Sequence, residues 1–77
     1  MMKILIVDDH VLFREGLAAI IRPQPDIEIA GMAGTVREAI EMARTVKPDI
    51  ILMDFNLPDG NGVEATRIIL DEQPACT

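Results

Sequence analysis

The sequence has few of the residues that give small proteins extra stability. Cys76 is the single cysteine in 77 residues, which excludes an internal disulfide framework and fits a reducing compartment. There is no tryptophan or tyrosine, and there are two phenylalanines, Phe13 and Phe55. Aliphatic residues, methionine and alanine must therefore fill the interior. A chain of this length forms one domain at most, and such a domain buries only about 60% of its unfolded surface.

Basic residues are also few, and long apolar runs are missing. Seven lysines and arginines stand against 13 acidic residues, which gives a formal net charge of −6. Binding to nucleic-acid phosphates needs clustered basic residues, so we expect no direct nucleic-acid contact. The apolar run 4–7 stops at Asp8 and Asp9 and is too short for a signal peptide or a membrane span. We therefore expect a cytoplasmic protein without membrane contact.

Two short apolar runs without polar alternation indicate buried strands. Residues 3–7 end in Asp8 and Asp9, and residues 50–53 end in Asp54. A parallel strand that is covered on both faces has no polar side, so its apolar residues are continuous. Residues 27–29 alternate instead, which is typical of a half-exposed edge strand.

Three further segments have the apolar periodicity of amphipathic helices. They lie between Asp9 and Pro23, between Thr35 and Pro48, and between Asn61 and Pro74. The residues of their predicted apolar faces are Phe13, Leu17, Ile20 and Ile21; Val36, Ala39, Ile40, Ala43 and Val46; and Val63, Thr66, Ile69 and Leu70.

Polar residues at the starts of these segments predict helix caps. Asp9 is a candidate N-cap of the first helix. Thr35 and Glu38 match a capping box, in which each side chain accepts a hydrogen bond from the backbone N–H of the other. Asn61 with Glu64 repeats a capping signal before the third helix.

The elements alternate as βαβαβα, which predicts an α/β fold over residues 1–77. Right-handed crossovers place the strands parallel, with helices on both faces of the sheet. If the crossover direction reverses once, the first and third strands become neighbours. Asp8, Asp9 and Asp54 then meet at one carboxyl edge, where ligands bind in open α/β sheets.

Three carboxylates at one edge repel one another unless a cation joins them. A few oxygen ligands, with room left for water and phosphate oxygens, suit Mg²⁺. An aspartate held beside this ion is a nucleophile suited to forming an aspartyl phosphate. The sequence therefore predicts a Mg²⁺ site with phosphoryl-transfer chemistry at Asp54.

Residues 4–10, Ile-Leu-Ile-Val-Asp-Asp-His, together with Asp54 and the segment 57–62, Leu-Pro-Asp-Gly-Asn-Gly, resemble the receiver domain of two-component response regulators. The run 9–17 is similar to the LuxR/NarL-type subclass, whose receivers precede a helix-turn-helix domain. The resemblance covers the whole chain and implies a flavodoxin-like (CheY-like) parallel sheet.

The resemblance also implies roles for individual residues. Asp54 would accept a phosphoryl group from a sensor histidine kinase. Asp9 would bind Mg²⁺ directly, Asp8 mainly through water, and Asn56 through its backbone carbonyl. Residues 58 and 60 would shape the loop. A receiver of this kind is a signalling module in transcription regulation and not an enzyme.

The chain departs from the family pattern in length. Receivers have five βα units, and this sequence carries the first three, so we expect it to be the N-terminal portion of a receiver, truncated and without an effector domain. The switch Ser/Thr of the fourth strand and the phosphate-binding Lys of the fifth are outside it. Lys3 and Lys47 lie at the wrong strand ends to replace them. Residues 50–53 become an exposed edge, which predicts a homo-oligomer or a domain-swapped dimer.

Other interpretations compete with these. The chain could be a non-signalling structural fragment that self-associates through its third strand. A small phosphotransferase or phosphatase is less favoured, because Asn56 stands where a second acid is needed. His10 is interpreted as a surface residue rather than a metal ligand. The segment 59–62 could form a hairpin turn, but the helical pattern that follows argues against it. An EF-hand is rejected because its glycine and closing glutamate are out of register.

Overall fold

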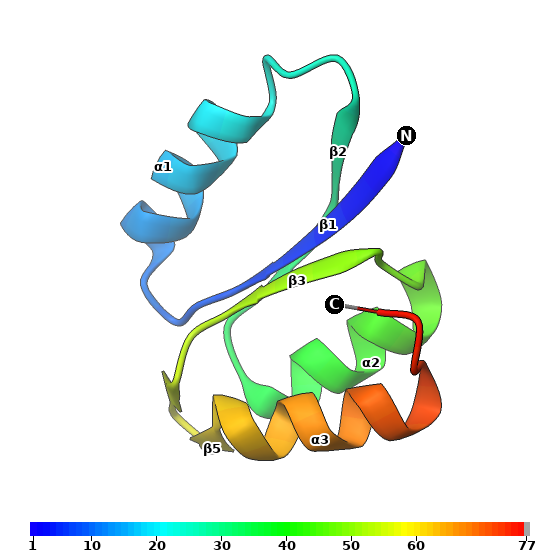
Figure 1. Ribbon diagram of the computed structural model, residues 1–77. Helices are drawn as coiled ribbons and strands as arrows, with labels where there is room; N and C mark the ends of the chain where they lie inside the picture. The colour runs from blue at the N-terminus through cyan, green and yellow to red at the C-terminus, as the bar shows by residue number, and fades with distance from the viewer. Residues whose placement is uncertain (77) are drawn as a thin grey trace.

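The computed structural model describes residues 1–76 as three helices and five strands (Figure 1). The elements in chain order are β1 Met2–Val7, α1 Val11–Ile21, β2 Ile27–Ala33, α2 Val36–Val46, β3 Ile50–Met53, β4 Asn56–Leu57, β5 Gly60–Asn61 and α3 Gly62–Glu72. The predicted alternation of strands and helices is confirmed. β2 continues beyond the predicted segment 27–29, as far as Ala33.

β2, β1 and β3 form one parallel sheet in that order, with β1 in the centre. Ile4 lies opposite Ile50, and Val7 lies opposite Met53. The pairing of β1 with β2 shifts register between Ile4 and Leu5. The third strand thus lies beside the first, as in the flavodoxin-like order, and the predicted reversal of the crossover direction is confirmed.

Helices cover both faces of the sheet, α1 on one side and α2 with α3 on the other (Figure 1). β1 has a strand on each side and helices on both faces, so its side chains Leu5, Ile6 and Val7 are fully buried. The main core lies between the sheet and the pair α2–α3. It consists of Leu5, Val7, Ala33, Ala39, Ala43, Leu57 and Ile69.

Small residues allow α2 to lie close to the sheet. Its buried positions are Ala39 and Ala43, and beneath it β2 carries Gly31. A Cβ at Gly31 would overlap the side chain of Met42. A larger residue at position 31 would therefore displace Met42 from the partly buried layer beside the core.

The α1 helix forms where predicted, but its apolar face is mostly uncovered. Ala18 is its one buried residue, whereas Phe13 is 55% exposed and Ile20 is 71% exposed. The predicted apolar stripe of this helix is therefore not a buried one. The physical reason is that no second helix lies beside α1 on this face in the described part of the chain (Figure 1).

The helix caps differ in part from the prediction. Asp9 does not cap α1: the N-cap residue is His10, which makes no side-chain capping bond. Thr35 caps α2 as predicted, because its Oγ1 accepts from the Glu38 N–H at 3.0 Å. The Glu38 carboxylate accepts instead from the Gly34 N–H at 3.0 Å, one residue before its predicted partner.

The segment after β3 forms a short hairpin and then continues directly into α3. β4 and β5 form an antiparallel hairpin, in which Leu57 pairs with Gly60. The turn of this hairpin lies at residues 58–59 and Gly60–Asn61 form its second strand, so the segment 59–62 is not itself a hairpin turn. Asn61 ends the hairpin and caps α3 as predicted, with its Oδ1 accepting from the Glu64 N–H at 2.8 Å.

In α3, Ile69 is buried as predicted, but Val63, Thr66 and Leu70 are exposed. The other buried residues of α3 are Gly62 and Ala65.

β3 lies at the edge of the three-stranded sheet. Within residues 1–76 it pairs with β1 alone, and Leu52 is 37% exposed. None of the helices in the described range has the length and apolar character needed to cross a membrane.

Candidate metal centre

Two neighbouring strands bring the predicted acidic residues together. The Asp8 N–H donates to the Ala33 carbonyl at 2.9 Å, and the Asp54 N–H donates to the Val7 carbonyl at 2.8 Å. These bonds continue the sheet ladder one residue past each strand. The backbones at Asp8 and Asp54 are therefore held side by side at the carboxyl edge of the sheet, as the sequence predicted.

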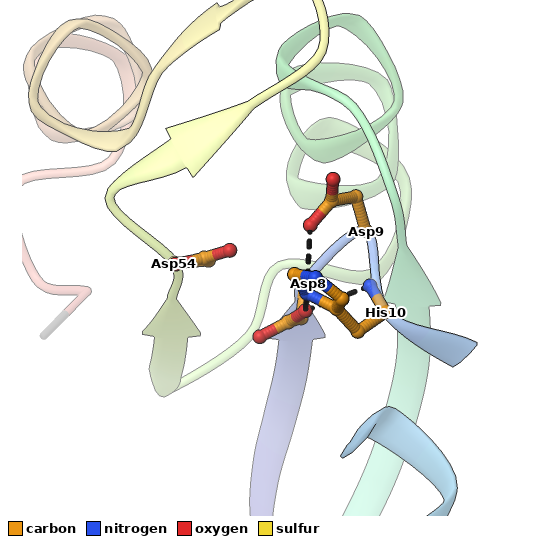
Figure 2. A group of neighbouring side chains, drawn as sticks. All are labelled: Asp8, Asp9, His10 and Asp54. Atoms are coloured by element: carbon orange, nitrogen blue, oxygen red, sulfur yellow. Dashed lines mark hydrogen bonds and ion pairs between the residues drawn. The ribbon is translucent and has the colours of Figure 1, made fainter. Parts of the chain in front are cut away.

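The side chains converge as well. Asp8, Asp9, His10 and Asp54 each offer one ligand atom, and these four atoms lie within 4.8 Å of one another. Asp54 points from the end of β3 towards the end of β1, where His10 lies between Asp8 and Asp9 (Figure 2). Three carboxylates from two strands thus face one small volume.

His10 is the basic partner of this cluster. Its Nδ1 lies 3.0 Å from Asp8 Oδ1 and 3.0 Å from Asp9 Oδ1. The hydrogen bond with Asp8, followed by the negative charges of Asp9 and Asp8, raises the pKa of His10 above its ordinary 6.5. From its sequence, His10 was expected to be an ordinary surface residue. Its side chain is indeed 75% exposed, but it belongs to the acidic cluster.

The cluster has the charge and donor set that a divalent cation needs. Asp8 is only 7% exposed, and within residues 1–76 no lysine or arginine forms an ion pair with Asp8, Asp9 or Asp54. Carboxylates that are crowded and partly desolvated repel one another unless a cation joins them. Oxygen ligands with an open side fit Mg²⁺.

The loop that follows Asp54 is tied to the rest of the fold by Asp59. Its Oδ1 accepts from the Val36 N–H at 2.7 Å, and its Oδ2 accepts from the Arg37 N–H at 3.1 Å. These two bonds lower the pKa of the Asp59 carboxyl below its ordinary 3.8. Sequence reasoning missed this role, because the partners lie 22 and 23 residues away along the chain.

Gly62 was missed for a similar reason. A Cβ at this position would overlap the Asp54 carbonyl oxygen and lie close to the Met53 side chain. The Gly62 N–H donates to the Phe55 carbonyl at 2.7 Å, which joins the two ends of the loop that follows Asp54. Asn56 lies in β4 within this loop. Its carbonyl as a metal ligand stays a prediction.

A hollow lies beside the acidic cluster on the face of the sheet that α1 covers, and Lys3 lies at the opposite end of β1. A hollow of 390 Å³ borders Asp8 and Asp54 on the side of α1, and its other lining residues include Phe13, Leu17 and Phe55. Lys3 is far from this edge: its Nζ donates to the Val46 carbonyl at 3.0 Å, at the end of α2 that precedes β3.

Comparison with known proteins gives consistent matches. The family model described as "Response regulator receiver domain" matches residues 4–77. The chain is similar to the DNA-binding transcriptional activator DevR/DosR of Mycobacterium tuberculosis, with 39% identity over 74 residues, covering 96% of this chain and 34% of that protein. It is also similar to a protein-glutamate methylesterase/protein-glutamine glutaminase of Nitrosospira multiformis, with 43% identity, covering 96% of this chain and 21% of that protein.

Solved structures agree. A crystal structure of a LuxR-family two-component response regulator from Aurantimonas sp. SI85-9A1 superposes with a TM-score of 0.91 at 37% identity, covering 99% of this chain and 54% of that chain. The chain thus spans about half of that crystallised response regulator chain and about a third or less of the curated relatives above.

Proposed function

The chain belongs to the response regulator receiver domain family, and from this we propose that it is a phosphoacceptor module in which Asp54 takes a phosphoryl group from a sensor histidine kinase in the presence of Mg²⁺. The observation that supports the proposal is the convergence of Asp8 and Asp9 with Asp54 from two neighbouring strands, within 4.8 Å.

The chain's own residues have defined parts in the transfer. A carboxylate oxygen of Asp54 attacks the phosphorus of a phosphohistidine or of a small acyl phosphate. The new P–O bond forms as the P–N or P–O bond of the donor breaks, and the donor's group leaves with that electron pair. Asp9 and Asp54, Asp8 through water, and the Asn56 carbonyl would hold the ion. When bound there, Mg²⁺ would supply positive charge against the transferred oxygens.

Intact mass after incubation with Mg²⁺ and acetyl phosphate tests the transfer. We expect the native chain to gain the mass of one phosphoryl group and Asp54→Asn to gain none. Absence of the gain in a native chain shown by circular dichroism to be folded would contradict the proposal. Asp9→Ala should lose Mg²⁺ binding, whereas Asp71→Ala, at an exposed position on α3, should keep it.

Signal reception is the activity that we assign to these residues. Relatives that share the matched segment carry different activities in their names, a transcriptional activator and a methylesterase. We infer that the shared segment receives the signal in the cytoplasm. Enzymatic action on other substrates and DNA contact would belong to the parts of those relatives that lie outside the match.

A second candidate function, self-association, is favoured by the uncovered edge of β3. Leu52 is exposed there, and an apolar hollow of 310 Å³ lies between β3 and α3, lined by residues that include Ile51, Met53 and Leu70. A second copy that paired its β3 antiparallel to this one would extend the sheet. It would also keep the two acidic clusters at opposite ends of the paired strands, which limits repulsion.

Light scattering coupled to size exclusion tests this candidate. We expect a dimer for the native chain, either with paired edges or with swapped elements, and a shift towards monomer for Leu52→Lys, because a lysine on an edge strand opposes pairing. Leu12→Lys, on the exposed face of α1, is the matched control and should leave the mass unchanged. A native chain that is monomeric at all concentrations would refute the dimer.

A further inference from the structure

The loop after Asp54 is a hairpin with two residues in each of its strands, β4 and β5. An isolated two-stranded hairpin is only marginally stable in water, so contacts outside the hairpin must hold it. Leu57 anchors it in the main core, and the Gly62 N–H joins its two ends by donating to the Phe55 carbonyl. Neither of these contacts involves the turn at residues 58–59.

Asp59 fixes this turn to another element of the fold. Its two carboxylate oxygens accept from the Val36 N–H at 2.7 Å and from the Arg37 N–H at 3.1 Å, which are the first two backbone N–H groups of α2. The hairpin also approaches α2 closely, because a Cβ at Gly60 would lie 3.2 Å from Val36 Cγ2. The turn is thus joined to the start of a helix that lies 23 residues earlier in the chain.

The first turn of α2 has a cap of its own. Thr35 Oγ1 accepts from the Glu38 N–H at 3.0 Å. Val36 is only half-buried and Arg37 is exposed, so water can satisfy their backbone N–H groups, as it does at many helix ends. The two hydrogen bonds to Asp59 therefore matter less for starting the helix than for fixing the hairpin.

The position of the hairpin bears on the candidate site because Asn56 lies in it, two residues after Asp54. Asn56 pairs with Asn61 across the hairpin, so its backbone moves with the hairpin as a whole. We propose that Asp59 is a positioning residue for phosphoryl transfer, which holds the hairpin and its Asn56 carbonyl in place beside Asp54 by binding α2. Asp59 acts through the backbone of the hairpin. This inference rests on the proposed function of Asp54.

Two variants at position 59 grade the contact with α2. Asp59→Ala removes both acceptors, whereas Asp59→Asn keeps one carbonyl oxygen, and its amide nitrogen cannot accept a hydrogen bond. Thr35→Ala is the matched control, because it removes the other side-chain bond to the first turn of α2 and leaves the hairpin untouched. Urea unfolding of each variant gives the stability lost, so that effects on the site are compared with effects on folding.

Phosphoryl transfer and ion binding are then measured on the full chain. With acetyl phosphate as donor, Asp59→Ala should raise the Mg²⁺ concentration that gives half-maximal phosphoryl gain by about 10-fold, at the low end of the loss caused by removing residues that orient metal ligands. Asp59→Asn should recover part of this loss, and Thr35→Ala should match the native chain. Calorimetry with Mg²⁺ alone should rank the four proteins in the same order.

Amide hydrogen exchange tests the link itself in the absence of both ion and donor. Residues 56–61 should exchange faster in Asp59→Ala than in the native chain, because the turn of the hairpin is released and opens locally. Thr35→Ala should leave exchange at these residues unchanged. Native exchange at residues 56–61 in Asp59→Ala would overturn the inference, since the hairpin would then be held without Asp59.

The remaining outcomes separate this inference from the proposed function. Native transfer and native Mg²⁺ affinity in Asp59→Ala, or equal losses in Asp59→Ala and Thr35→Ala, would overturn the inference and leave the phosphoacceptor site standing. A native chain that binds Mg²⁺ more tightly than Asp59→Ala but gains no phosphoryl group would refute the proposed function and keep Asp59 as a positioning residue of the ion site. A folded native chain that neither binds Mg²⁺ nor gains a phosphoryl group would refute both.

Discussion

On the face of the sheet that α2 and α3 cover, Leu5 and Val7 pack with the alanines of α2 and with Ile69. On the opposite face, α1 buries Ala18, while Ile20 and Phe13 remain largely exposed (Figure 1). All three helices are amphipathic in sequence. α2 and α3 together cover one face of the sheet, whereas α1 lies on the other face without a helical neighbour in the described range.

Hydrogen bonds that join α2 to α3 and to the residue after it add to the difference between the two faces of the sheet. Arg44 on α2 donates two hydrogen bonds to the Glu72 carboxylate on α3, at 2.8 and 2.7 Å, and Gln73 donates from its side chain to the Ala43 carbonyl at 2.7 Å. The lesson is that amphipathic periodicity shows which side of a helix is apolar, and neighbouring elements decide whether that side is buried. The open face is also the one whose hollow borders Asp8 and Asp54.

We expect the largest difference in stability between the two faces when one large apolar side chain on each face is shortened to alanine. Leu5→Ala should lower the free energy of unfolding by about 2–5 kcal/mol, because Leu5 is fully buried beneath α2. Ile20→Ala on α1 should change it by less than about 0.5 kcal/mol. Urea unfolding followed by circular dichroism measures both. Similar losses at the two positions would show that α1 closes its face as fully as α2 and α3 close theirs.

Glycine-to-alanine substitutions at positions 62 and 16 should change the free energy of unfolding in opposite directions. Gly62→Ala should destabilise the protein by about 1–3 kcal/mol, because the added methyl overlaps the Asp54 carbonyl oxygen. Gly16→Ala on α1 meets no atom within 4 Å and should stabilise by about 0.4–1 kcal/mol through the unfolded state.

Ion binding provides a second measurement on the same glycine pair. Mg²⁺ affinity should fall in Gly62→Ala, since Asp54 is displaced, and stay unchanged in Gly16→Ala. A Gly62→Ala variant with native stability and native affinity would contradict the close approach of α3 to Asp54.

A smaller, pH-dependent effect on stability is expected from the two hydrogen bonds that Asp59, in the loop after Asp54, accepts from the backbone of α2. Folding lowers the pKa of the Asp59 carboxyl, so the ionised form stabilises the native state above the unfolded value of 3.8. This stabilisation should be lost as the pH falls through the lower, folded pKa. Asp59→Ala should therefore reduce the urea midpoint at pH 7, and its difference from the native chain should shrink at acid pH.

Asp26→Ala, in the turn before β2, is the matched control for Asp59→Ala. It removes an exposed acid whose side chain accepts no hydrogen bond within residues 1–76. A pH-dependent loss of the same size in both variants would show that net charge, and not the cap on α2, is responsible.

Much of the candidate site could be predicted from local patterns. Continuous apolar runs indicated β1 and β3, and Asp8, Asp9 and Asp54 came directly after them, so parallel pairing was enough to bring them together. Asp59 and His10 show the limit of such reasoning. The partners of Asp59 are the backbone N–H groups of Val36 and Arg37 in α2. Neither the sequence around Asp59 nor the sequence around these two residues indicates that they meet.

The sequence by itself determined the order of strands and helices, the cap of α2 at Thr35, and the acids at the strand ends, because these depend on side-chain periodicity and on hydrogen bonds between near neighbours. Only the tertiary structure decided that the face of α1 stays open, that Gly62 must be a glycine, and that His10 lies between two carboxylates. Burial and close approach depend on elements that meet across the fold, and a pattern along one segment does not contain its neighbours.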